Sequence, residues 1–264
     1  MTDIELGLPA DCPVRAEPLD DGAIWRVLLA TPKANIVDME KVEVLTAIFD
    51  RAKTATDLKA IVIEGEGPHF SFGASVQEHL PGQFEAMLRG FHGLFGRMLD
   101  ASVFTLAAVR GQCLGGGLEL VFFCNRVIAS PDAKLGQPEI MLGVFAPVAS
   151  VALADRVGRG AAEDLCISGR SVSAAEALRI GLADQIADDP GEAALAYARK
   201  YLLPKSASSL RMAQRAVRRE FGERFRREIA EVERLYAEEL MATADANEGL
   251  NAFLAKREPQ WRNA

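Results

Sequence analysis

Short apolar runs alternate with segments of helical period through the first 110 residues of the chain. The runs at residues 23–30 (AIWRVLLA), 60–65 (AIVIEG) and 105–111 (TLAAVRG) have the length and composition of buried strands. Between them, apolar residues recur every three to four positions, first from Asp38 onward and then over residues 83–99. Strands that alternate with helices in this order predict an α/β fold in which the sheet is covered.

The character of the chain changes near residue 195. The sequence beyond it, to residue 257, contains helix formers with dense Arg and Glu and no strand signal. We therefore divide the chain into an α/β core, residues 1–195, which carries the site, and a helical region, residues 196–264, which packs against the core or a neighbouring subunit. Residues 1–20 show no period, and we expect them to form a loose lead-in.

A cluster of glycines follows the third apolar run. Gly115, Gly116 and Gly117 stand in succession between a predicted strand and LELVFFCNRV, which we expect to be a helix buried in the core. Glycines let a ligand approach the backbone closely, and free amides at a helix N-terminus attract a negative oxygen. The spacing matches neither a dinucleotide fingerprint nor a phosphate-binding loop. Tight packing of strand on helix is the alternative; we favour an anion site.

Two glutamates stand among apolar residues. Glu119 follows the glycines directly, beside Leu118 and Leu120, and Glu139 follows Pro138 in LGQPEIMLG. Burial raises the pKa of a carboxyl group, and a raised pKa beside an oxyanion site suits acid–base chemistry. The alternative for Glu119 is a carboxylate that only stabilises the helix start. We expect the two glutamates to hold one water between them and to share its protons.

A third candidate is the loop HFSFGASV, residues 69–76, which follows the strand at 60–65. Its small residues can offer a second backbone amide to a negative oxygen, and oxyanion holes commonly use two such donors. The histidines lack metal-ligand spacing and the serines lack a nucleophile elbow, so the sequence predicts neither a metal site nor a serine hydrolase.

Composition limits the partners and the compartment. The formal net charge is −7, which argues against a dedicated nucleic-acid binder. The longest apolar stretches are too short to span a bilayer, and the acidic N-terminus lacks the features of a signal peptide. The four cysteines, none in a C-x-x-C pair, fit buried free thiols in a reducing compartment. We expect a cytoplasmic protein with no membrane or nucleic-acid partner.

Taken together and in this order, HFSFGASV, GQCLGGGLELVFFCNRVIAS, KLGQPEIMLG and GRGAAEDLCISGRSVSAAEALRIGLADQI resemble the enoyl-CoA hydratase/isomerase (crotonase) superfamily over nearly the whole chain. The resemblance implies a spiral of ββα units with a C-terminal helical trimerisation region, assembled as trimers or dimers of trimers. It implies an acyl-CoA thioester as substrate, with CoA as part of that substrate and no separate cofactor.

Carried onto this sequence, the resemblance assigns the oxyanion hole to the amides of Ala74 and Gly116. It makes Glu119 and Glu139 the catalytic pair of a hydratase, a hydro-lyase, because isomerases and dehalogenases of the superfamily usually lack one or both. The division of acid and base roles between them stays open. It also places a CoA site at Lys33 and Ala34, and at Lys256, which would reach across from a neighbouring subunit; for both lysines a solvated surface charge is the alternative.

Two departures from the family pattern limit which acyl groups the substrate can carry. Ser75 stands where the loop usually has an acidic residue, and Val144 to Ser150 replace a glycine-rich segment that lines the acyl pocket in relatives. We expect Phe72 and Phe145 to reshape that pocket. Both segments resemble those of cyclohexa-1,5-diene-1-carbonyl-CoA hydratases of anaerobic aromatic degradation, which gives our first functional hypothesis.

Two alternatives stay open. One is a general 2-enoyl-CoA hydratase of the fatty-acid β-oxidation type. The other is a non-catalytic module of the same fold that binds acyl-CoA or RNA, the latter through the Arg-rich run at residues 211–227. Interleaved glutamates make helix-surface ion pairs the favoured explanation of that run.

Overall fold

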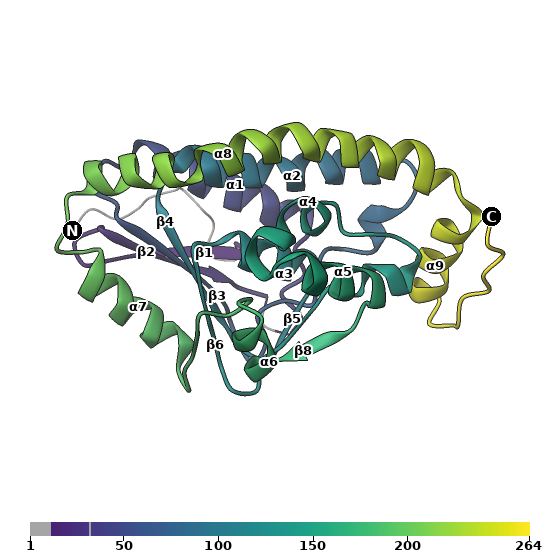
Figure 1. The fold of residues 1–264 in the computed structure, drawn as a ribbon, viewed down its shortest axis with the longest axis horizontal. Coiled ribbons are helices and arrows are strands. Elements are labelled where there is room, and N and C mark those ends of the chain that lie inside the picture. The colour runs from purple at the N-terminus through teal and green to yellow at the C-terminus, as the bar shows by residue number, and fades with distance from the viewer. Residues whose placement is uncertain (1–11, 32) are drawn as a thin grey trace.

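The computed structural model describes residues 12–31 and 33–264, and its centre is a six-stranded sheet (Figure 1). The strand order is β1-β2-β3-β4-β6-β9. Strand β1 pairs antiparallel with β2, and every other neighbouring pair is parallel. The bounds are β1 Val14–Leu19, β2 Ile24–Leu29, β3 Ala60–Gly65, β4 Phe104–Val109, β6 Arg126–Ala129 and β9 Gln185–Ile186.

Helices cover both faces of this sheet, which is why its strands read as continuous apolar runs. On β3, Ile61 and Ile63 belong to the core that also contains residues of α1 (Met39–Thr54) and α2 (Phe84–Ala101). The alternate residue Val62 faces the other way, into a smaller core built with α7 (Pro190–Tyr201). Figure 1 shows α7 on the side of the sheet opposite to α1 and α2. The predicted covered α/β sheet is confirmed.

A second, three-stranded sheet lies beside the first. It consists of β5 (Gln112–Leu114), β7 (Lys134–Gly136) and β8 (Ser171–Ser173), in that order. The chain passes from β4 in the large sheet directly to β5 in the small one and returns through α3 (Gly116–Phe123); β6 and β7 repeat the passage. This alternation between two sheets is the expected spiral of ββα units.

Local sequence signals explain where several helices begin. Asp38 caps α1 by accepting a hydrogen bond from the Lys41 amide, and Ser173 caps α6 by accepting from the Glu176 amide in a Ser-x-x-Glu sequence, which is typical of a capping box. The remaining shorter elements are α4 Pro147–Val157, α5 Arg159–Ser168, α6 Ala174–Arg179 and the 3₁₀ turns η1 Gln77–His79 and η2 Pro138–Leu142.

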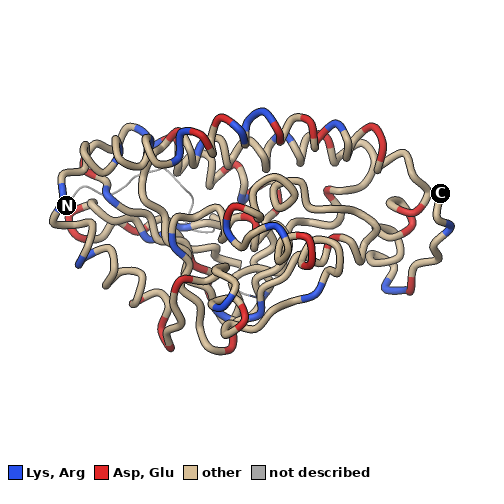
Figure 2. The backbone as a smooth tube through the Cα atoms, in the orientation of Figure 1, with Lys and Arg blue, Asp and Glu red and all other residues tan. Residues whose placement is uncertain are grey.

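The C-terminal part is helical, as expected. Helix α8 runs from Ala207 to Arg234, continues into a π-helical turn η3 (Leu235–Glu239) and a 3₁₀ turn η4 (Leu240–Ala242), and α9 (Ala244–Leu254) follows. The predicted boundary at residues 195 and 196 falls inside α7. Helix α8 packs along α2 at one edge of the molecule, and near its start Arg211 reaches the C-terminal end of α1; charges of both signs lie along its length (Figures 1 and 2).

One expectation about local structure is wrong. The lead-in through residue 20 contains β1, an edge strand whose pattern Glu17 and Pro18 interrupt; Pro18 is tolerated because it lies in the edge strand. After β7, Pro138 occupies the start of the 3₁₀ turn η2. Residues 1–11 of the lead-in, including those used to exclude a signal peptide, lie outside the described residues.

The cysteines are free thiols, as predicted; Cys12, Cys113 and Cys124 are buried and Cys166 is half-buried. Within the described ranges, we find no helix with the length and apolar character needed to cross a membrane.

Candidate active site

A cleft of about 630 Å³ opens between the loop after β3, the glycine cluster, η2 and α9. Its walls are largely apolar, and they include parts of four segments that are far apart in the sequence. The lining residues that matter below are Phe72, Ala74, Ser75, Gly115, Glu139, Phe253 and Arg257.

Ala74 forms an isolated β-bridge with Val37, and its own amide N–H points away from that bridge. Gly73 carries positive φ (105°), its nitrogen donates to Ser71 Oγ at 3.0 Å, and its carbonyl accepts from the Val37 nitrogen at 2.9 Å. Because a trans peptide is planar, fixing the Gly73 carbonyl on Val37 turns the Ala74 N–H to the opposite side. Ala74 lines the cleft.

The Gly116 amide is fixed in the same manner from the other wall. Gly115 has φ 51°, and its carbonyl accepts from the Glu119 nitrogen at 2.9 Å in the first turn of α3. That bond turns the Gly116 N–H outward from the helix N-terminus, where the dipole favours a negative oxygen. A side-chain carbon placed on Gly116 would lie 3.3 Å from the Ala74 nitrogen, so the two amides are neighbours.

Both nitrogens lack a hydrogen-bond acceptor within residues 12–31 and 33–264. Two adjacent, unpartnered backbone donors at a helix start are the arrangement that can bind an oxyanion. Glycine is needed at position 116, because a methyl group there would also lie 3.2 Å from Ala74 Cβ and from the Phe91 ring.

Glu139 reaches the same place from η2. A Cβ on Gly115 would lie only 2.6 Å from Glu139 Oε1, which explains why this position needs glycine in addition to its positive φ. The other carboxylate oxygen, Oε2, is buried and has no hydrogen-bond partner among the described residues. An orphaned carboxylate oxygen in a cleft is available to substrate or water.

Glu119 lies behind this wall, only 3% exposed. Its Oε1 accepts from the Ala149 nitrogen at 2.8 Å, in the first turn of α4. The α4 N-terminus therefore holds a carboxylate that α3 presents, and its dipole stabilises the charged form.

Burial raises the pKa of both carboxyl groups. For Glu119 the removal of water has the largest effect, the negative charge of Glu139 raises the pKa further, and the α4 amides lower it. For Glu139 the loss of water also has the largest effect. The negative charge of Glu139 raises the pKa of Glu119, so the two groups titrate as a pair.

The structure brings most of the other predicted residues to the cleft mouth. Phe72 and Ser75 line the cleft, and Phe72 is 40% exposed. The Phe72 nitrogen donates to the Ala34 carbonyl at 2.9 Å, which holds Ala34 and the exposed Lys33 beside the same loop. The Ser75 carbonyl accepts from His79 Nδ1 at 2.8 Å.

Two predicted residues lie elsewhere. Phe145 is not among the residues that line the cleft; it is half-buried and its ring packs edge-on against Tyr236, with 5.2 Å between centroids. Lys256 is exposed and also outside the lining, with φ 52°. Its predicted role concerns a neighbouring subunit and stays a prediction.

Sequence reasoning missed the α9 wall and one buried tyrosine. Phe253 and Arg257 line the cleft although more than 100 residues separate them from Glu139. Tyr236 is fully buried, and its hydroxyl has no partner within the described ranges.

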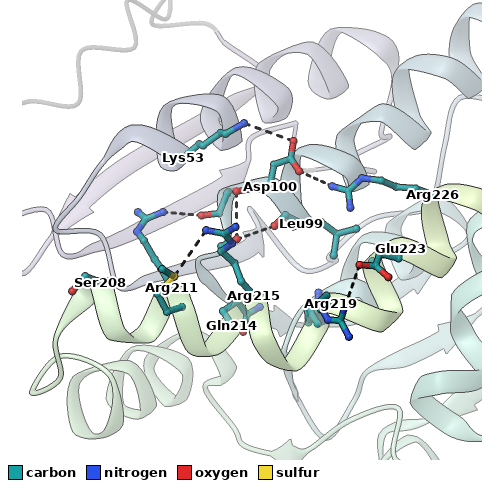
Figure 3. Close-up of a pocket in the computed structure, with 15 residues that line it drawn as sticks. Lys53, Leu99, Asp100, Ser208, Arg211, Gln214, Arg215, Arg219, Glu223 and Arg226 are labelled. Atoms are coloured by element: carbon teal, nitrogen blue, oxygen red, sulfur yellow. Dashed lines mark hydrogen bonds and ion pairs between the residues drawn. The ribbon is translucent and has the colours of Figure 1, made fainter.

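A second cleft of about 690 Å³ lies between α8 and the C-terminal ends of α1 and α2 (Figure 3). It contains none of the predicted site residues. Most of its lysine and arginine side chains already form hydrogen bonds or ion pairs with other residues of the protein. Arg211 donates to the carbonyls of Ala52, Ala55 and Ala101, and thereby caps α1 and α2.

The expectation of ion pairs along the helix surface holds only in part for this Arg-rich run. Arg219 pairs with Glu223 one turn on, at 3.7 Å, whereas Arg226 reaches Asp100 on α2. Both pairs are drawn in Figure 3. In the part of the chain that the structure describes, no group of three His, Cys, Asp or Glu residues is arranged to hold a metal ion.

Comparison with known proteins gives a family and close relatives. The family model described as enoyl-CoA hydratase/isomerase matches residues 20–264. The chain is 51% identical over 254 residues to a cyclohexa-1,5-dienecarbonyl-CoA hydratase of Thauera aromatica, covering 96% of this chain and 98% of the relative. It is 35% identical to a "Probable enoyl-CoA hydratase" of Mycobacterium bovis, over 91% and 95% of the two chains.

A solved structure of an enoyl-CoA hydratase from Bacillus halodurans superimposes with a TM-score of 0.84 at 18% identity, covering 91% of this chain and 99% of that one. At 18% identity this match shows only that the two proteins share a fold.

Proposed function

Because this chain belongs to the enoyl-CoA hydratase/isomerase family and is a hydro-lyase, we propose that it adds water to cyclohexa-1,5-diene-1-carbonyl-CoA. The chemical group is the one named for the relative that is 51% identical over almost the whole chain. The thioester carbonyl oxygen is bound by the Ala74 and Gly116 amides, and Glu119 and Glu139 handle the water and its protons.

The single observation that carries the proposal is the juxtaposition of the two free amides with the two buried carboxylates. Attack of water on the carbon β to the thioester moves negative charge onto the carbonyl oxygen. Two preorganised N–H donors stabilise that charge, and losing one donor typically costs on the order of 3 kcal/mol. Adjacent to them, Glu139 Oε2 is buried and free to contact the reacting atoms.

The raised pKa values give each carboxyl group a proton-transfer role at neutral pH. One carboxylate accepts a proton from the attacking water, and the other carboxyl group supplies a proton to carbon. In a conjugated cyclic diene the electrons flow through the enolate, so the new C–O bond forms at the β carbon and the new C–H bond at the far end of the diene. Water is consumed, and no redox change occurs.

The walls of the cleft support a cyclic acyl group. Phe72 is exposed at the mouth, and Met141 and Phe253 line the wall around Glu139. Transfer of an apolar ring from water into such surroundings is favourable. Burial of its surface contributes about 25 cal/mol per Å² to the binding free energy. The CoA part of the bound thioester would then extend out of the cleft past Lys33 and Ala34.

Product analysis in labelled water tests the proposal. With D₂O the product should carry one deuterium at the far diene carbon, and with H₂¹⁸O one heavy oxygen at the β carbon; NMR and mass spectrometry report the two positions. Deuterium at the carbon next to the thioester carbonyl would mean ordinary 1,2-hydration and would contradict the conjugate addition.

A general 2-enoyl-CoA hydratase is the second candidate. The named activity of the 35% identical relative favours it, and it would use the same amides and carboxylates. Crotonyl-CoA, a short straight-chain thioester, distinguishes the two: the first candidate predicts poor turnover of crotonyl-CoA and the second predicts good turnover. We also propose that the chain works as a trimer or a dimer of trimers in the cytoplasm.

A further inference from the structure

The segment that follows α9 turns back along that helix (Figure 1). We call residues 258–264 the strap. Acidic side chains of α9 accept hydrogen bonds from its backbone nitrogens: Glu248 from Gln260 at 2.8 Å, and Asp245 from Arg262 and Asn263 at 2.7 Å each. The residues on both sides of Trp261 are therefore fixed to α9, and this fixes where the Trp261 side chain can lie.

The Trp261 ring meets two glycines at a junction between α9 and η2. A Cβ on Gly249, within α9, would lie 2.9 Å from Trp261 Cη2, and a Cβ on Gly143, directly after η2, would lie 3.1 Å from Cζ3. Glycine inside a helix is normally unfavourable. Here it is needed, because the Leu142 carbonyl and the Trp261 ring both approach the Gly249 backbone too closely for a side chain. The ring thus packs on α9 and on the end of η2 together.

The same end of η2 is bonded to Glu139. The Val144 nitrogen donates to the Glu139 carbonyl at 3.3 Å, and the Gly143 nitrogen donates to the Ile140 carbonyl at 3.0 Å. Within the described ranges, Glu139 Oε2 has no hydrogen-bond partner that would hold it in place. The position of this carboxyl group beside Gly115 therefore depends on the backbone of η2.

We propose that Trp261 is a positioning residue for Glu139: the strap holds the Trp261 ring on the two glycines, and the ring holds η2 where the carboxyl group can reach the reacting atoms. Trp261 is not among the residues that line the cleft, so it acts through η2 and not by touching the substrate. The inference rests on the proposed hydration, in which Glu139 transfers a proton. Proton transfer requires hydrogen-bond distance, and a misplacement of about 1 Å can cost on the order of 10²-fold in rate.

The first test removes the ring. With the diene thioester, Trp261→Ala should lower kcat by about 10- to 100-fold, and Trp261→Phe, which keeps an aromatic ring at the junction, should recover most of the loss. Tyr201→Ala is the matched control, because Tyr201 on α7 has the same exposed fraction as Trp261, 44%. It should match the wild type.

A double-mutant cycle separates the positioning of Glu139 from a general loss of structure. Trp261→Ala should have less than about a twofold effect on kcat when it is added to Glu139→Gln, because the group through which the ring acts is already absent. The same fold loss in both backgrounds would mean that the ring does not act through Glu139. That result, or wild-type kcat in Trp261→Ala, would overturn this inference and leave the proposed function intact.

Amide hydrogen exchange tests the structural step without an activity assay. In Trp261→Ala the Val144 amide, which is bonded to the Glu139 carbonyl, should exchange faster than in Tyr201→Ala. Equal exchange in the two variants would contradict the contact between the ring and η2. A wild-type protein that hydrates neither the diene thioester nor crotonyl-CoA would overturn the proposed function, and the catalytic purpose of this contact with it.

Discussion

At the residue scale, the proposed chemistry depends on two carboxyl groups that are buried, where a negative charge is costly. The burial of Glu119 could be predicted because this residue lies directly after three glycines in an otherwise apolar helix; its catalytic role stays a prediction. The sequence around Glu139 was a weaker indication of function when taken alone. It became a candidate because Glu119 offered a second carboxyl group. Tyr236 was beyond sequence reasoning, because its neighbours Phe84 and Phe145 come from segments about 90 to 150 residues away in the chain.

The raised pKa of Glu119 makes a prediction about stability. An unfolded glutamate loses its proton near pH 4.3, whereas the folded protein keeps that proton to higher pH, so the folded state binds more protons and the free energy of unfolding falls as pH rises. Glu119→Gln removes this cost and keeps an oxygen for the Ala149 amide. Its Tm relative to the wild type should increase by roughly 5 °C between about pH 5 and about pH 8. A constant or shrinking difference, measured by calorimetry, would show that the carboxyl group is already ionised in the fold at pH 5.

Gly116 tests the oxyanion site directly. A methyl group at this position would crowd Ala74 and the Phe91 ring and cover the space in front of the Ala74 amide. Gly116→Ala should therefore lower kcat/KM about a hundredfold, the usual effect of losing one oxyanion donor.

Gly93→Ala is the matched control, since nothing lies within 4 Å of a Cβ at that position on α2. It should retain activity and gain slightly in stability from the better helix propensity of alanine. Equal activity of the two variants, in the same steady-state assay, would contradict the placement of the oxyanion beside the Ala74 and Gly116 amides.

At the element scale, local signals predicted the interior strands and the caps, and failed at edges and short strands. Strand β3 is a run of buried apolar residues, and Ser173 lies in a capping box, so both were recognisable. Strands β5, β7 and β8 have three residues each and exist because they pair with one another. Pairing between distant segments leaves no periodic pattern in such short pieces.

Helix α8 stabilises other helices through its arginines. Arg211 donates to carbonyls at the ends of both α1 and α2, including a bond of 2.7 Å to Ala101. Arg211→Ala would leave these carbonyls without their donor and should reduce the free energy of unfolding by about 2–3 kcal/mol. Chemical denaturation measures this loss.

Arg219 on the same helix is the natural comparison, because its partner Glu223 is also on the surface. Arg219→Ala should leave the denaturation midpoint nearly unchanged, since exposed ion pairs contribute little. If both substitutions cost the same, the capping role assigned to Arg211 is wrong.

At the scale of the whole molecule, the C-terminal region both closes the cleft and leaves apolar side chains in the open. Phe253 lines the cleft and is 54% exposed, and Val217 on α8 is 83% exposed. A subunit interface over this region would remove such side chains from water, as the proposed assembly requires. Light scattering coupled to size-exclusion chromatography should give three or six times the chain mass of 28.5 kDa; a monomer at micromolar concentration would contradict the proposed assembly.

The central claim is that one site, with two amides and two carboxyl groups, hydrates a conjugated cyclic thioester. The most direct measurement is the initial rate of hydration, followed by absorbance, with cyclohexa-1,5-diene-1-carbonyl-CoA and crotonyl-CoA side by side. The wild type should turn over the diene far faster, and Glu119→Gln and Glu139→Gln should each lower kcat by a factor on the order of 10² to 10⁴. Faster turnover of crotonyl-CoA, or full activity in either glutamine variant, would contradict this account.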